Sequence, residues 1–241
     1  MPKDSILLLG GTGPSGICVL RELSLRNQKA VVFARNPAKI PSDLASNALF
    51  KVVKGELTDT EALSTALSEC HTVISLIGPV PGGNSSTGRE YADIYRTLLL
   101  LMQKQGVRRI FAMGTISIYQ PEDSQHLIRW LIVWLLRTLF NKAYQNIISI
   151  HNVFEQDREA TRDIDWTVYR LGIIRGSGDE IATWAQDRED EKTYVGAVGA
   201  AGWSIVHKRA ALARWLVEAA QTGATEWIGR TPAVSKLAGS S

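Results

Sequence analysis

Short apolar runs alternate with helical stretches along the first half of the chain. Strands are predicted at residues 6–9, 31–34, 49–53, 71–76 and 108–112. The first of these runs has no polar face, as expected of a strand buried in a parallel sheet. Helices are predicted between them at 15–26, 58–68 and 89–105. Strands and helices that alternate in this way form a doubly wound α/β sheet, whose ligands lie beyond the carboxyl ends of the strands.

The run at 127–140 has a different pattern, because it is apolar nearly all round and contains neither glycine nor proline. It predicts a helix that is buried on more than one side. With two arginines inside it, the run is too short for a membrane span, which takes about 20 apolar residues. It is interpreted as the cap of an apolar substrate pocket, as a subunit interface in a homodimer, or as a membrane-surface anchor. The first two are favoured, because no basic face accompanies the apolar one.

The rest of the chain is expected to complete one domain over residues 1–241, with 115–145 and 173–205 as the substrate side. Proline, glycine and serine predict a loop at 79–88, and a second loop is expected at 173–178. A short helix at 181–190 and an amphipathic helix at 208–221 are also predicted. Late strands are expected at 194–196, 203–206 and 226–228.

The turn after the first strand carries the clearest chemistry. It satisfies both G-x-G-x-x-G and G-x-x-G-x-x-G, and a helix follows directly. Glycines of this spacing allow a tight turn and a close approach of the backbone to a pyrophosphate, which the amino end of the helix stabilises. The sequence therefore predicts a Rossmann-type fold with a dinucleotide bound at Gly10, Thr12, Gly13, Pro14, Ser15 and Gly16.

Arg35 indicates which dinucleotide is bound. It stands at the end of the second strand, about 20 residues past the turn, where an NAD-selective site usually has an acid. A carboxylate there binds the ribose hydroxyls, whereas a guanidinium presents a planar fork to a 2′-phosphate. The predicted cofactor is NADP(H).

Composition narrows the class of protein further. The chain has 241 residues and a net charge of +3 with scattered basic residues, which gives little electrostatic support for nucleic-acid binding. Two cysteines are too few for a disulfide framework or a zinc site. The first strand begins within the first few residues and leaves no room for a signal peptide, so a cytoplasmic location is expected.

GGTGPSG at 10–16 and FARNPAKI at 33–40 resemble the atypical short-chain dehydrogenase/reductases, in particular the NmrA-like and NAD(P)H-binding branch. The resemblance implies that the backbone of Leu57 meets the adenine, and that Ile77 and Gly78 line the ribose and pyrophosphate. It also assigns Met113 and Arg170 to the cofactor site.

The same resemblance places the catalytic groups after the fifth strand and on a later helix. It puts Thr115 at the hydroxyl that polarises a substrate carbonyl, with Ser117 as the alternative; Thr115 is equally expected to hydrogen-bond only its own turn. The Tyr-x-x-x-Lys motif, which supplies the acid in relatives, is absent. His151 falls at the lysine position, where it would donate a proton or contact the ribose, and Tyr144 is a weaker candidate.

Two functions remain. The favoured one is an NADP(H)-dependent oxidoreductase, or a cofactor-assisted isomerase, that acts on a small, largely apolar substrate. The alternative is a non-catalytic NADP(H)-sensing regulator, which the resemblance allows and which the missing Tyr-x-x-x-Lys favours.

Overall fold

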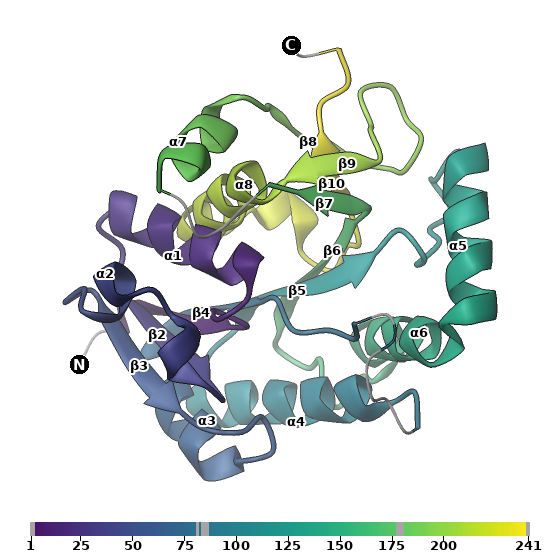
Figure 1. Ribbon diagram of the computed structural model, residues 1–241. Coiled ribbons are helices and arrows are strands. Elements are labelled where there is room, and N and C mark those ends of the chain that lie inside the picture. The colour runs from purple at the N-terminus through teal and green to yellow at the C-terminus, as the bar shows by residue number, and fades with distance from the viewer. Residues whose placement is uncertain (1–2, 81, 83–86, 177–180, 240–241) are drawn as a thin grey trace.

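The computed structural model describes residues 3–80, 82, 87–176 and 181–239 (Figure 1). Within these residues the main sheet has eight strands in the order β3-β2-β1-β4-β5-β6-β10-β8. Its strands are β1 (Ser5–Leu9), β2 (Ala30–Ala34), β3 (Phe50–Lys54), β4 (Cys70–Ser75), β5 (Arg109–Thr115), β6 (Asp165–Leu171), β8 (Thr193–Gly196) and β10 (Ala233–Lys236). The doubly wound parallel sheet predicted from the apolar runs is confirmed.

The sheet reverses its direction of winding between β1 and β4, which are parallel neighbours although β2 and β3 lie between them in sequence. In this parallel register Leu8 pairs with Val32 on one side and with Ile74 on the other. Ligands of open α/β sheets bind at the carboxyl edge beside such a reversal. Only β8 runs antiparallel in the main sheet, against β10.

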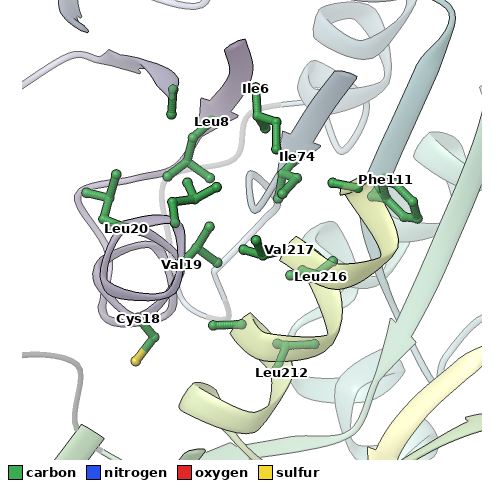
Figure 2. Close-up of a cluster of buried hydrophobic side chains, with 14 of the residues drawn as sticks. Ile6, Leu8, Cys18, Val19, Leu20, Ile74, Phe111, Leu212, Leu216 and Val217 are labelled. Carbon is green, nitrogen blue, oxygen red and sulfur yellow. The ribbon is translucent and has the colours of Figure 1, made fainter. Parts of the chain in front are cut away.

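Helices cover both faces of the sheet (Figure 1). One face packs against α1 and α8, where Leu20, Leu212 and Leu216 meet Leu8 and Ile74 of the strands (Figure 2). The other face packs against α3, α4 and α6. The helices are α1 (Pro14–Leu25), α2 (Ser42–Ala45), α3 (Thr60–Ser68), α4 (Glu90–Gln105), α5 (Leu127–Leu139), α6 (Asn141–Gln156), α7 (Ile181–Glu189) and α8 (Arg209–Thr222), with short 3-10 turns η1 (Pro37–Lys39) and η2 (Thr225–Trp227).

The C-terminal elements differ from the sequence prediction in three places. The expected loop at 173–178 contains β7 (Ile173–Arg175), which pairs with β9 (Val206–Lys208) in a separate two-stranded sheet. The strand expected at 226–228 is the turn η2, and β10 joins the sheet instead. Short strands without clear alternation are stabilised by pairing with strands that are distant in the sequence. A local pattern does not reveal such pairing. Residues 177 and 178 of that loop, and 81 and 83–86 of the loop expected at 79–88, lie outside the described residues.

The prediction that 127–140 is buried on more than one side is wrong. The segment forms α5 and its C-cap as expected, but within α5 only Arg129 and Val133 are buried. Trp130 is 59% exposed and Trp134 is 50% exposed. Figure 1 shows α5 at the rim of the molecule, beside α6 and away from the sheet. An apolar pattern shows only that a helix avoids water, and does not show whether its own chain supplies the cover.

Candidate functional site

The glycine turn between β1 and α1 is shaped by close backbone contacts. Gly10 has a φ of +85°, a conformation that side chains other than glycine rarely adopt. A Cβ at Gly16 would lie 2.2 Å from the carbonyl oxygen of Gly10, so no side chain fits there. The N–H of Gly13 donates to the same Gly10 oxygen at 3.2 Å. The turn is therefore a closed loop of bare backbone, as close approach to a phosphate requires.

The amino end of α1 faces out of this turn. Gly13 is the N-cap, Pro14 is the first helical residue, and no side chain of the described residues caps the helix. The first turn of α1 also contains no acid. The positive end of the helix dipole is consequently left for an external anion, which is the arrangement of helix-terminal phosphate sites.

A pocket of about 260 Å³ adjoins the turn at the carboxyl edge of the sheet. It brings together six of the expected cofactor residues, and its lining adds residues that sequence reasoning did not single out. The expected ones are Gly10, Thr12, Arg35, Leu57, Ile77 and Gly78, and the additional ones are Phe33, Ala34, Asn36, Lys39, Gly55, Glu56, Leu76 and Tyr91. Because this lining continues from the glycine turn across β2, β3 and β4, it is shaped for one elongated ligand.

Lys39 is the most informative of the additional residues. It ends η1, the single helical turn that Pro37 begins directly after β2. That turn brings Lys39 back into the pocket beside Arg35, and both side chains are exposed at its rim. Two cations in the lining of the pocket suit a ligand that carries a phosphate better than one with ribose hydroxyls alone. The Arg-Asn-Pro-x-Lys run was the available signal, since it contains both cations.

The floor of the pocket at Ile77 is supported by buried tyrosines. The hydroxyl of Tyr95 donates to the carbonyl oxygen of Ile77 at 3.0 Å and lies 2.7 Å from the Ser75 hydroxyl. Tyr169 donates to the carbonyl oxygen of Ser75 at 2.9 Å. Burial raises the pKa of Tyr95 and of Tyr169, so both remain protonated donors. They position the chain where β4 leaves the sheet, a role that no sequence motif indicated.

Met113 lies where the pocket continues toward β5. A Cβ built on Gly78 would come 2.9 Å from its Cε atom, so the two residues are in contact across the edge of the sheet. A side chain at position 78 would displace the end of the flexible Met113 side chain. Met113 is half-buried and lies two residues before Thr115, the last residue of β5. The candidate cofactor and candidate catalytic residues are thus connected along β5.

The hydroxyls of Thr115 and Ser117, the two candidates for the reactive group, are less available to a substrate than a reactive group should be. The Thr115 hydroxyl accepts a hydrogen bond from the backbone N–H of Ser117 at 3.2 Å, as expected if it serves its own turn. The Ser117 side chain is fully buried, and its hydroxyl has no partner among the described residues. Tyr144 is half-buried on α6, two turns before His151 and on the same side of that helix.

His151 is buried in α6, and its surroundings determine its tautomer. Its Nε2 lies 2.9 Å from a carboxylate oxygen of Glu155, which accepts, so Nε2 carries the proton. Nε2 also lies 3.3 Å from the side-chain amide of Gln120. Burial lowers the pKa of His151 below its usual value; Glu155 opposes this, and the charge of Arg170 adds to it. The imidazole is neutral near pH 7, and its bare Nδ1 has no partner among the described residues.

Arg170 lies away from the pocket. It is fully buried, and its guanidinium binds both carboxylate oxygens of Asp123 and the carbonyl oxygen of Ile118. Asp123 also pairs with buried Arg129 at 2.9 Å. Burial would raise the pKa of Asp123, but the hydrogen bonds and charge of Arg170 outweigh it and lower the pKa. This position does not support the expected cofactor contact; Arg170 instead fastens β6 to the loop before α5.

Together, the strand order, the glycine turn and the pocket define a dinucleotide-binding protein of the Rossmann type. Residues 10–222 match the model of a family described as NAD(P)H-binding, and the chain belongs to that family. Its members' fold is also seen in solved structures. No curated protein sequence matches the chain significantly.

Three solved structures illustrate the likeness in fold. A short-chain dehydrogenase/reductase from Veillonella parvula, solved with NADP, has a TM-score of 0.73 at 14% identity, over 98% of this chain and 96% of that one. The anaerobilin reductase ChuY from Escherichia coli O157:H7 has a TM-score of 0.68 at 15% identity, over 96% and 97%. A putative NAD-dependent epimerase/dehydratase from Bacillus halodurans has a TM-score of 0.65 at 15% identity, over 97% and 94%.

Among the described helices, none has the length and apolar character needed to cross a bilayer. The described residues also contain no group of three or more histidine, cysteine or acidic side chains arranged to hold a metal ion.

Proposed function

We propose that this chain is an NADP(H)-dependent oxidoreductase acting on a small, largely apolar substrate. The observation that carries the proposal is the pocket that is lined both by Arg35 and Lys39 and by Gly10 and Thr12 of the glycine turn. The turn accepts a pyrophosphate, and the two cations suit the 2′-phosphate that distinguishes NADP(H) from NAD(H). The Veillonella relative solved with NADP has the same fold and supports this choice.

The residues at the end of β5 and on α6 would act on the substrate side. The cofactor supplies the hydride when it is bound. Met113 and Gly78 would position the reacting end of the ligand beside Thr115. The Thr115 hydroxyl keeps its proton free to donate, since its hydrogen bond to Ser117 uses it as an acceptor. It would therefore stabilise an oxygen on which negative charge develops.

His151 is better suited to accept a hydrogen bond from a hydroxyl group than to act as the proton donor. Its pKa is lowered, Nε2–H is directed to Glu155, and the atom left without a partner is Nδ1, an acceptor. In this tautomer Nδ1 of the neutral imidazole accepts a hydrogen bond and carries no proton to deliver. We infer that His151 holds a ribose hydroxyl of the cofactor, and that the proton comes from solvent or from the substrate itself.

Cofactor titration tests the first part of the proposal. Calorimetry with NADPH and NADH should show tighter binding of NADPH by the wild type. Each of Arg35→Ala and Lys39→Ala should weaken NADPH binding about 10- to 100-fold and leave NADH nearly unchanged, since a charge-assisted contact contributes roughly 1.5–3 kcal/mol. The matched control is Lys51→Ala, an exposed lysine on β3 that is outside the pocket lining and pairs with Glu69. Equal wild-type affinities for the two cofactors would contradict the proposal.

The NADP(H)-sensing regulator is the second candidate, and a specific observation favours it. The Thr115 hydroxyl already serves its own turn, and the chain has no Tyr-x-x-x-Lys acid. NADPH oxidation, followed by absorbance with a panel of small apolar carbonyl and quinone substrates, separates the two. The enzyme should show turnover that Thr115→Val lowers while NADPH affinity is retained, and His151→Ala should weaken NADPH binding without changing the pH profile. Tight NADPH binding with no turnover on any substrate favours the regulator.

A further inference from the structure

Helix α5 has its apolar side turned outward. Successive residues are about 100° apart around a helix, and the buried Arg129 and Val133 lie on one side of it. The opposite arc carries large apolar side chains that are at least 44% exposed. These side chains are Leu127, Ile128, Trp130, Leu131, Trp134, Leu135 and Leu139. A surface of this kind on a soluble protein marks a binding face.

The orientation of α5 is held by polar contacts on its inner side. Arg129 is 2% exposed, and its guanidinium donates to the carbonyl oxygens of Ile116 at 2.8 Å and Ile118 at 2.7 Å. Its third contact is the ion pair with Asp123. The apolar arc could turn toward the body of the protein only if this buried network were broken first. The outward arc is thus a fixed feature of the fold.

The middle of the arc has the spacing of a helix-packing seam. Leu127, Leu131, Trp134 and Thr138 follow one another at intervals of four, three and four residues, which is the repeat of a and d positions in a coiled coil. Thr138 interrupts the seam only formally. Its hydroxyl donates to the carbonyl oxygen of Trp134 at 2.9 Å and is therefore satisfied by its own helix. The other three seam positions are apolar, and the Thr138 hydroxyl needs no partner from outside the helix.

We propose that α5 is the interface of a homodimer, in which it packs antiparallel against α5 of a second copy. A two-fold axis near the middle of the seam places Leu131 against the partner's Trp134, and Leu127 against the partner's Thr138. Trp130 and Arg137 flank the seam on one side, so the axis also brings Arg137 to the partner's Trp130, a cation–π pair. The face is then complementary to itself, as a two-fold interface must be.

Area and charge favour a second copy over a lipid surface. The exposed apolar side chains of the arc offer on the order of 800 Å² per protomer, which is the upper limit to what α5 can bury and is similar to the area that each partner buries in an interface of standard size. Arg137 is the only charged residue on the outward arc of α5. Helices that lie on anionic membranes carry many lysines and arginines beside their apolar face, and α5 lacks them.

The dimer would also complete a pocket. A cavity of about 500 Å³ lies at the amino end of α5, lined by Tyr119, Ser124, Gln125, His126, Leu127, Arg129 and Trp130. Leu127 and Trp130 belong both to this lining and to the outward arc. The carboxyl end of the partner's α5 would therefore cover the open side of the pocket and convert it into an enclosed, mainly apolar site.

Light scattering coupled to size exclusion provides the test. The wild type should elute as a dimer, and the double variant Leu131→Glu with Trp134→Glu should dissociate at least about 100-fold more readily, because like charges meet across the seam. The matched double variant Leu131→Lys with Trp134→Lys should also be monomeric. Mixing the two should restore a dimer of one chain of each kind. A mixed dimer would show that both variants are folded, because the two chains can pair only if each presents its exposed arc. Misfolding would then be excluded as the cause of dissociation.

Cysteine cross-linking tests the orientation. The variant carrying Leu131→Cys and Trp134→Cys should form an intermolecular disulfide, whereas Leu127→Cys should not, since antiparallel packing keeps the two copies of residue 127 about 16 Å apart along the helix axis. The native Cys18 and Cys70 are buried and do not interfere. A wild-type monomer at micromolar concentration, or cross-linking through Leu127→Cys alone, overturns the proposal. Binding of a monomeric wild type to phosphatidylserine vesicles would identify the face as a lipid-binding surface instead.

Discussion

Helices α1 and α5 are nearly equal in length, and α5 is the richer in apolar residues, yet α1 is the one that is buried. In α1 every residue from Gly16 to Leu23 is buried, because the sheet covers one side and α8 another. In α5 the apolar side chains face outward, and the chain covers only Arg129 and Val133. The comparison shows that an apolar helix surface must be covered, and that the amount of apolar sequence does not decide whether its own chain covers it. Whether the same chain or a second chain covers that surface depends on where the helix lies in the fold.

The two helices also place buried charge differently. In α1 the carboxylate of Glu22 is fully buried and pairs with Arg26 at 2.6 Å and with Arg188 of α7 at 2.6 Å. These pairs lie at the edge of a helix that hydrophobic packing already holds. In α5 the buried pair of Arg129 with Asp123 joins the helix to the sheet, because Asp123 also pairs with Arg170 of β6. The loss of stability on breaking these polar contacts should therefore differ between the two helices.

The largest effect is expected at the turn that begins α1. Gly16→Val should abolish folding, because its Cβ alone would lie 2.2 Å from the Gly10 carbonyl oxygen and backbone atoms cannot yield that far. Urea denaturation and circular dichroism measure it. The control is Gly106→Ala at the end of α4, where φ is +66° but no atom lies within 4 Å, and where a cost of only about 1 kcal/mol is expected. Native-like stability of Gly16→Val would refute the argument.

The attachment of α5 should be the next most sensitive feature. Asp123→Ala leaves Arg129 and Arg170 buried without their carboxylate, and unpairing a buried ion costs about 3–5 kcal/mol. The free energy of unfolding from urea titration measures the loss. Asp4→Ala removes a carboxylate from an exposed pair with Lys29 and should leave stability unchanged within error. Equal stability of the two variants would show that the buried network does not hold α5.

A matched pair of leucines tests the comparison directly. Leu20→Ala in α1 should lower the free energy of unfolding by about 2–5 kcal/mol, because it empties a fully buried site. Leu135→Ala in α5, where the side chain is 44% exposed, should change the stability of the monomer by less than about 0.5 kcal/mol. Both are measured by urea denaturation at a protein concentration low enough to keep the chain monomeric. A large loss for Leu135→Ala in the monomer would mean that α5 packs within its own chain.

The smallest expected effect is a dependence of stability on pH that arises from His151 of α6. Burial depresses the pKa of His151 in the folded state, so the unfolded chain binds the proton first as pH falls. Stability should therefore decrease below about pH 6.5, the unperturbed value for histidine, until the folded state is protonated too. His151→Gln should make the decrease between pH 7.5 and pH 5.5 shallower, with His207, whose pKa is also lowered by burial, retaining part of it. An unchanged slope in His151→Gln would assign the dependence to other groups.

The cofactor half could be predicted from sequence because each of its features is local. The run from Ile6 to Leu9, the glycines that follow and Arg35 lie within one strand-helix-strand unit, and they meet through the geometry of that unit alone. Lys39 enters the same pocket by a single 3-10 turn. Motifs of this kind carry their contacts with them, so a linear pattern is sufficient.

The remaining features depend on contacts between distant residues. Arg170 had a motif position that suggested a cofactor contact, but in the folded chain its guanidinium meets Asp123, 47 residues away. Tyr95 supports Ile77 from α4 although no pattern links them. Strand β10 was missed because its place is decided by pairing with β6 and β8, and a strand of four residues carries little propensity of its own.

By itself, the sequence determined the alternating fold, the glycine turn and the position of Arg35 at the end of the second strand, because these follow from periodicity and from residues close together in the chain. Only the tertiary structure decided that α5 turns its apolar side outward. Hydropathy records the free energy of leaving water and contains no direction, whereas the direction of α5 is set by one buried guanidinium, Arg129, and by the carboxylate and carbonyl oxygens that the fold brings around it.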